Sequence, residues 1–411
     1  MDKYLILYSD TFLWYDETYG VLYNCKYASF LKFDLTSLLL KYCIQLNCFD
    51  NMYTVKIDPE DEKDTDFSNW LNQITTYQIG EIKETNNNEK IFSFPPILNL
   101  QNEIEERRMN DENYRSTNIA NNFHEVTFFL GGEKLTDEEE AYSKQILYPI
   151  STTLSLSVDD ICSFLDNNNI EYLRQINIVC NKVYPEFENL FNNLVQYGIP
   201  LTYYFLGNKV DFIEKLSGYS SLDKISLGIY FYDIESFKEI EAFLSDKKVD
   251  YQWLFLLHEE NELDKVEEII NLYHITCYKL LPVLTNSLSN LSFFENNVFT
   301  SLDDLSQLTL SKQNIFCNQT INSNNWGQLF ITPDKCVYAN LNGTPIGTIN
   351  ENILHLIRKE MTNDSSFWKC TREKVSPCKK CIYRNLCPPP SNYEFFSRKF
   401  NLCTIFKSSE Y

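Results

Sequence analysis

Glycine and histidine are scarce in this chain, and long apolar runs are absent. The 411 residues include 11 glycines and four histidines, and no two histidines are spaced as HxxxH or HExxH. There is no Walker A loop, no GxGxxG and no GxSxG, which excludes the common signatures of phosphate binding, dinucleotide binding and serine hydrolysis. No stretch of 18 apolar residues exists, and no basic segment precedes an apolar run. We therefore expect neither a membrane span nor a signal peptide.

The chain is strongly acidic, with 57 Asp and Glu against 36 Lys and Arg and a formal net charge of −21. Phosphates would be repelled, so we expect no nucleic acid and no anionic membrane as partner, whereas a basic peptide or protein fits. We expect a cytoplasmic protein, whose 13 cysteines are thiols or metal ligands rather than disulfides. Eight scattered cysteines are expected to be small buried apolar residues: Cys25, Cys43, Cys48, Cys162, Cys180, Cys277, Cys317 and Cys336.

The pattern of apolar residues divides the chain into four parts. Residues 1–60 predict a β-rich unit with one helix in DLTSLLLKYCIQL, and residues 61–89 predict an acidic linker. Strand and helix patterns then alternate over residues 90–285, beginning with KIFSFPPILNL at 90–100, and the strands are continuous apolar runs, as in buried parallel sheets. This predicts an α/β fold, a βα barrel or a doubly wound sheet, and the repeats favour a partial barrel. Residues 286–411 predict a hairpin, a short helix and a loop-rich cysteine tail.

The tail carries a CxxC-x5-C-x15-C pattern, formed by Cys378, Cys381, Cys387 and Cys403. Four thiolates suit either tetrahedral zinc or a [4Fe–4S] cluster, and the spacing alone does not separate the two. Metal-free thiols or a disulfide are the third possibility. A short tail of this kind cannot bury a core of its own, so a metal staple is expected. Cys370 is expected to be a spare thiol.

The tail and the preceding hairpin, WGQLFITPDKCVYANLNGTPIGTI, resemble the SPASM domain that follows the barrel of many radical SAM peptide maturases. That resemblance implies two auxiliary clusters, one of which uses the four tail cysteines. The second cluster requires three further cysteines. Cys317 matches the first of them, but Asn340 and Ser391 stand at the other two positions. The resemblance therefore implies one metal centre, a [4Fe–4S] cluster or Zn²⁺.

A radical SAM enzyme also requires CxxxCxxC after its first barrel strand, and this chain has no such motif. No cysteine lies between Cys48 and Cys162, and the QNEIEE that follows KIFSFPPILNL offers poor ligands for an iron–sulfur core. Binding of S-adenosylmethionine is therefore not expected, and the chain is expected to be a pseudoenzyme. Gly131, Gly132 and Glu133 resemble the GGE motif that contacts the methionine amino group, either as a relic of that site or as a simple glycine turn.

FFENNVF (293–299), VYAN (337–340) and PCKKCIYRNLCPPPSNYE with its later NLC together resemble the pseudo-radical-SAM proteins of the GG-Bacteroidales peptide-modification systems. The resemblance implies two partners, a true radical SAM maturase and a ribosomally made precursor peptide with a Gly-Gly leader. The N-terminal unit resembles a leader-recognition element, with an edge strand within Val21–Phe33. A cap on the barrel is the alternative.

We therefore expect a non-catalytic accessory protein in peptide maturation that binds the precursor peptide, a partner maturase, or both. One alternative is a redox or hydrolytic enzyme that uses the tail cluster or the barrel mouth. There His258, at the end of a strand and beside Glu259 and Glu260, is the candidate residue. A zinc-stapled binding protein with no role in peptide modification is the other alternative.

Overall fold

The computed structural model describes residues 2–85, 91–96, 121–168, 170–182, 184–208, 219, 222–245, 247 and 249–405. Two small antiparallel sheets form the N-terminal unit, one in the order β5-β1-β6 and one in the order β2-β3-β4. Helices α1 and α2 complete it, and α1 begins after Thr36, whose hydroxyl accepts a hydrogen bond from the Leu39 N–H. The elements are β1 Asp2–Leu7, β2 Thr11–Tyr15, β3 Tyr19–Asn24, β4 Ser29–Asp34, α1 Ser37–Asn47, β5 Thr54–Ile57, α2 Thr65–Thr76 and β6 Gly80–Thr85.

The linker expected at 61–89 is wrong for residues 61–85, which form a helix and a strand of the N-terminal unit. Phe67, Trp70, Leu71 and Ile74 recur at helical spacing along α2 and are buried in the core of that unit. Asp64 caps this helix, and Asp66, its one acidic residue, faces solvent. The acidic composition hid an amphipathic helix whose apolar residues follow a period of 3.6.

Six strands of the large sheet lie side by side in chain order, from β7 to β12, and all of them are parallel. The α/β class is thus confirmed, with a large and mostly parallel sheet, while the partial barrel stays a prediction. The expected strand at 90–100 is wrong for residues 91–96, which have no regular secondary structure, and 97–100 lie outside the described residues. The elements are β7 Glu125–Phe129, α4 Val158–Asp166, β8 Gln175–Val179, α5 Phe187–Val195, β9 Leu201–Leu206, β10 Ser226–Tyr230, α7 Ile234–Ser245, β11 Asp250–Leu257, α8 Glu260–Tyr273 and β12 Tyr278–Pro282.

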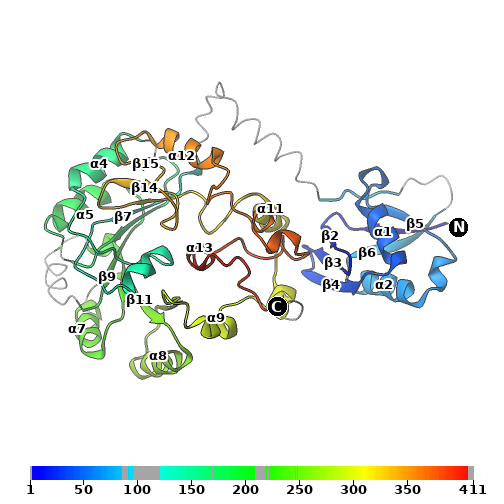
Figure 1. The fold of residues 1–411 in the computed structure, drawn as a ribbon, viewed down its shortest axis with the longest axis horizontal. Helices are drawn as coiled ribbons and strands as arrows, with labels where there is room; N and C mark the ends of the chain where they lie inside the picture. Colours follow the sequence, from blue (N-terminus) through cyan, green and yellow to red (C-terminus); the bar gives the residue numbers. More distant parts are fainter. Residues whose placement is uncertain are drawn as a thin grey trace.

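The two faces of the large sheet differ because side chains alternate along each strand. Val126 and Phe128 of β7 belong to the main core with residues of α4, α5 and α7. Glu125, Thr127 and Phe129 point to the opposite face, which we call the inner face. Figure 1 shows α4, α5, α7 and α8 around the outside of the sheet.

The C-terminal part extends this sheet and then leaves it. Strand β13 pairs in parallel with β7, and β14 and β15 follow as antiparallel neighbours. A turn at 332–335 joins β13 to β14, and these two strands form the expected hairpin. The elements are α9 Leu291–Asn297, α10 Leu302–Gln307, α11 Lys312–Thr320, β13 Gln328–Ile331, β14 Cys336–Tyr338, β15 Gly347–Thr348, α12 Ile353–Thr362 and α13 Asn392–Ser397, with 3₁₀ turns at Arg372–Lys374 and Cys378–Lys380.

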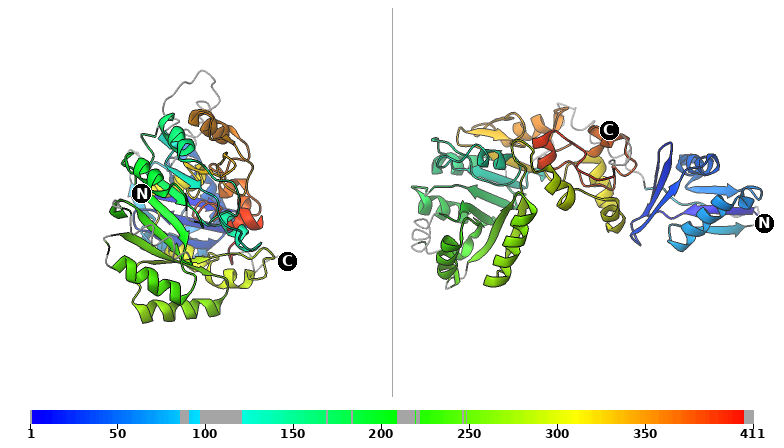
Figure 2. Two further views of the ribbon diagram at one scale, coloured as in Figure 1. Left: turned by 90° about the vertical axis from the view of Figure 1, so that its left-hand side faces the viewer. Right: turned by 60° about the horizontal axis from the view of Figure 1, so that its bottom comes forward.

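The N-terminal unit and the cysteine tail share an apolar contact that we call the terminal interface. Tyr23 Oη donates to the Leu308 carbonyl at 2.8 Å and accepts from the Leu310 N–H at 2.7 Å, and Lys312 pairs with Asp10 at 2.7 Å. Figures 1 and 2 show the tail between the N-terminal unit and the large sheet. The buried residues of the interface are Phe12, Val21, Tyr23, Leu305, Ile315, Cys381, Ile382, Tyr383 and Leu386.

Candidate functional site

The four tail cysteines of the CxxC-x5-C-x15-C pattern all line one small cavity. A 3₁₀ turn carries Cys378, and Cys381 follows it directly. Cys403 arrives from the end of the chain through a parallel bridge to Thr300. Cys370, the expected spare thiol, does not line the cavity. The fold therefore brings together residues that are 25 positions apart in the sequence, as the pattern predicts.

Cys378 and Cys381 are buried, and Cys387 and Cys403 are half-buried. Burial raises the pKa of Cys381 to about 12. The hydrogen bond that its Sγ accepts from the Tyr383 N–H partly opposes this rise. Burial also raises the pKa of Cys378 and Cys387, and nearby Arg372 opposes the rise in both. Burial thus disfavours the thiolate forms of Cys378, Cys381 and Cys387. Deprotonating them together calls for a positively charged ion among them.

The donor set fits a soft metal, because all four cysteines line one small cavity. Within the described ranges no three His, Cys, Asp or Glu side chains stand in metal-binding geometry. The metal centre stays a prediction, with Cys378, Cys381, Cys387 and Cys403 as its ligands.

A buried ion pair, which the sequence analysis missed, holds the walls of the cysteine cavity. Arg372 makes a two-pronged contact with Glu394, and its Nε donates to the Pro388 carbonyl at 2.8 Å. Its Nη1 also donates to the Phe400 carbonyl at 3.1 Å and lies 3.8 Å from Cys378 Sγ. One guanidinium thus joins three loops of the tail. Both residues look like ordinary surface charges in the sequence, and only the fold brings them together.

An asparagine network surrounds Asn340, where the SPASM resemblance requires a second-cluster cysteine. Asn340 Nδ2 donates to Asn325 Oδ1 and to Asn392 Oδ1, both at 2.7 Å. Ser391 begins α13 with a capping box. Hard amide and hydroxyl groups that bond to each other and to the backbone are poor ligands for an iron–sulfur core.

Residues 135–150, which we call the covering segment, pack on the inner face of the large sheet. Tyr142 and Tyr148 are buried against Tyr230, the last residue of β10. The Gln145 side chain is anchored by two hydrogen bonds to the Leu284 backbone, at 2.8 and 2.9 Å. Parallel α/β sheets bind ligands at the carboxyl ends of their strands. Here the chain's own aromatic side chains fill that place.

His258 helps to hold the covering segment. Its Nε2 lies 2.6 Å from Tyr142 Oη, and its Nδ1 lies 3.1 Å from Glu262 Oε2. The expected neighbours Glu259 and Glu260 are not its partners; Glu262, one helical turn further on, takes that place. Both ring nitrogens of His258 are therefore engaged. These contacts give His258 a structural role in holding the covering segment.

We expect Tyr142→Phe to lower the free energy of unfolding by about 1 kcal/mol, because it removes one hydrogen bond. Tyr142→Ala should cost about 3–5 kcal/mol, because it also leaves a cavity. Urea unfolding of both variants measures this, with the exposed Tyr232→Ala as control. If Tyr142→Ala unfolds at the same urea concentration as the control, the covering segment is not packed as described.

Gly131 and Gly132 have local packing reasons for being glycine. Gly131 has φ +81°, and a Cβ on Gly132 would lie 1.4 Å from Asn181 Oδ1. Asn181 Nδ2 donates to the Glu133 carbonyl at 3.1 Å. These contacts are those of a glycine turn after β7, so a relic of a methionine-binding motif is not needed to explain them. Gly131, Gly132 and Glu133 as a cofactor contact stay a prediction.

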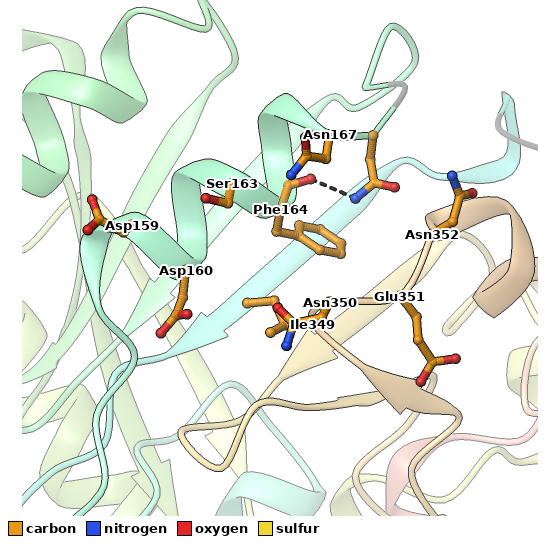
Figure 3. Close-up of a pocket in the computed structure, with 10 residues that line it drawn as sticks. Asp159, Asp160, Ser163, Phe164, Asn167, Ile349, Asn350, Glu351 and Asn352 are labelled. Atoms are coloured by element: carbon orange, nitrogen blue, oxygen red, sulfur yellow. Dashed lines mark hydrogen bonds between the residues drawn. The ribbon is translucent and has the colours of Figure 1, made fainter.

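A polar cavity of ≈ 350 Å³ lies between α4 and residues 349–352 (Figure 3). Several of its polar side chains are already used within the fold. Asp160 bonds to Lys335 at 2.9 Å and to the Ser157 N–H, and Asn168 bridges α4 to α12. We assign no ligand to this cavity, because Asp160, Asn168 and Asn352 on its walls hold the ends of α4 and α12.

No known protein-family model matches the sequence, and no curated protein is a detectable relative. Two crystal structures of SuiB from Streptococcus suis match, one bound to the precursor peptide SuiA and one bound to S-adenosylmethionine. Each covers 93% of this chain and 94% of SuiB at 10% identity, with TM-scores of 0.40 and 0.39. This likeness is coarse, and we infer no residue's role from it. None of the helices in the described ranges combines the length and apolar character needed to cross a bilayer.

Proposed function

We propose that this protein is a non-catalytic accessory protein in the maturation of a ribosomally synthesised peptide. It binds the precursor peptide through its N-terminal unit and docks on a partner radical SAM maturase. The observation that carries the proposal is an open groove between α1 and the edge strand β5, lined by Lys41, Gln45, Thr54, Lys56 and Ile91 among others.

The groove exposes a short strand edge, which ends where the Met52 carbonyl accepts a hydrogen bond from the Ser93 N–H at 2.9 Å. Leu7 N–H donates to the Tyr53 carbonyl at 3.1 Å, and hydrogen-bonded pairs alternate along an antiparallel ladder. The backbone groups of Thr54 and Lys56 therefore point away from β1, towards α1. Asp58, two residues on, follows the same alternation, since its N–H donates to Tyr42 Oη on α1 at 3.1 Å. An extended peptide can add here as a fourth strand.

The edge strand expected within Val21–Phe33 is less suitable. This range covers β3, the central strand of its sheet, and β4, an edge strand. Val21 and Tyr23 are buried in the terminal interface, so the cysteine tail occupies one face of that sheet. The groove at β5 lies outside this contact, and nearby Phe92 and Phe94 expose more than half of their surface for further apolar contact.

Two observations support the non-catalytic part of the proposal. The sequence has no CxxxCxxC, and the covering segment fills the carboxyl ends of the parallel strands. We expect the protein, reduced and supplied with S-adenosylmethionine, to make no 5′-deoxyadenosine above a protein-free control. Repeated turnover would overturn this part of the proposal.

The strand-addition site is tested by Lys56→Pro. The N–H of residue 56 faces the groove and makes no hydrogen bond to β1. Proline removes this N–H without breaking the pairing with β1, so the fold should tolerate the substitution. We expect binding of a labelled leader peptide that ends in Gly-Gly to weaken at least about tenfold by fluorescence anisotropy, since proline removes a main-chain hydrogen bond and blocks strand pairing. Lys56→Ala is the matched control, because it removes the side chain and its ion pair with Asp2 but keeps the backbone. Equal binding by both variants would rule out β5 as the peptide edge.

A further inference from the structure

A separate cavity of ≈ 200 Å³ opens on the inner face of the large sheet, near the amino ends of β7 and β13. Glu125, the first residue of β7, stands directly opposite Gln328 of β13 in the register. Part of the wall is apolar, formed by Ile146, Leu147, Phe330 and Leu341, and the remainder is polar, formed by Ser143, Lys144, Asn340 and Asn392. The cavity thus combines one carboxylate with an apolar wall and a polar wall.

The Glu125 carboxylate is only partly satisfied within the fold. Its Oε1 accepts a hydrogen bond from Asn177 Nδ2 at 2.6 Å. Burial raises its pKa, and the bond from Asn177 opposes that rise. Lys144 also lines the cavity, but in the described residues neither it nor any other Lys or Arg pairs with Glu125. Glu125 is half-buried, so its charge is partly desolvated, and a cation from outside would offset that cost.

We propose that this cavity receives a basic side chain, with its ammonium or guanidinium group on Glu125 and its aliphatic stem along Ile146, Leu147 and Phe330. A lysine-like side chain has this combination of an apolar stem and a charged tip. Gln328, opposite Glu125 in the register, also lines the cavity. The net charge of −21 attracts such a ligand over longer distances. The inference rests on the proposed function in one respect, that the side chain belongs to the bound peptide or partner.

The test uses small probes, so that it does not depend on the peptide. Nα-acetyl-lysine methylamide and the uncharged Nα-acetyl-norleucine methylamide are titrated into the full-length protein by NMR or calorimetry. We expect the lysine probe to bind at least about tenfold more tightly than the norleucine probe, because only it forms a charge-assisted hydrogen bond. Equal binding of the two probes, or binding of neither, would overturn the proposal.

The variant Glu125→Gln tests whether the lysine probe binds at this cavity. Its amide oxygen still accepts from Asn177, so the strand contact is kept while the charge is lost. We expect it to abolish the preference for lysine, whereas Glu351→Gln, in the separate polar cavity of Figure 3, should keep it. Lys56→Pro should leave probe binding unchanged, so a failure of the peptide groove and a failure of this cavity are distinguishable. An unchanged lysine preference in Glu125→Gln would refute the inference.

Discussion

Cys381→Ser is expected to lose the bound metal and to lower the free energy of unfolding by at least about 3 kcal/mol, since binding energy at a structural metal site is folding energy. Cys381 lines the cysteine cavity and is also buried in the terminal interface. Loss of the metal is therefore expected to weaken the tail and its contact with the N-terminal unit. The measurement is iron, sulfide and zinc per chain after anaerobic purification, followed by thermal unfolding with and without chelator.

The exposed Cys277→Ser is the matched control and should keep both metal and stability. About four irons and four sulfides per chain would identify a cubane cluster and keep electron transfer to a partner under consideration. One zinc without sulfide would identify a structural staple. Wild-type protein with no metal, or a Cys381→Ser variant that keeps it, would contradict the four-cysteine centre.

Breaking the Arg372–Glu394 pair is expected to destabilise the protein as much as Cys381→Ser does. The two side chains are 11% and 1% exposed, and removing one partner leaves the other charge buried without compensation. We expect Glu394→Gln or Arg372→Met to cost about 3–5 kcal/mol in unfolding experiments. Arg372→Lys should also be impaired, because an ammonium cannot make the two-pronged contact.

The fully exposed pair Lys63–Glu60 provides the control, with side chains 69% and 77% exposed. Lys63→Met should leave the unfolding midpoint unchanged, since exposed ion pairs contribute little. If Arg372→Met behaves like Lys63→Met, the buried pair does not hold the tail together. A double variant, Arg372→Met with Glu394→Leu, should recover part of the stability because neither charge is then stranded.

Local signals predicted the repeating part of the fold well. Ser157 before an apolar run predicts the start of α4, and the structure shows a capping box there. The continuous apolar runs expected over residues 90–285 include two parallel strands, QINIV in β8 and LTYYFL in β9. In the N-terminal unit, the acidic run DPEDEKD just before α2 conceals the apolar stripe of that helix. The cysteines show the limit of composition: Cys43 and Cys180 are buried as expected, whereas Cys48 and Cys277 are exposed.

What the sequence does not encode locally could not be predicted. The CxxC-x5-C-x15-C pattern identifies four residues that share a cavity because metal-ligand spacing is itself a local signal. The fold brings together three pairs of residues that no spacing rule connects: Arg372–Glu394, Tyr142–His258 and Glu125–Asn177. The open edge at β5 depends on which strands are left unpaired, which is a property of the whole sheet.

The terminal interface sets the order in which this chain folds during synthesis. The N-terminal unit completes its own core from residues 5–79, so it can fold early. Its outer face, with Phe12 and Val21, finds its partners only when residues beyond 300 have left the ribosome, and the Tyr23–Leu308 bond spans 285 positions. Until then a folded domain carries an uncovered apolar surface, the condition in which nascent chains aggregate or engage chaperones. Production of truncated versions that end before the tail is therefore expected to yield insoluble protein.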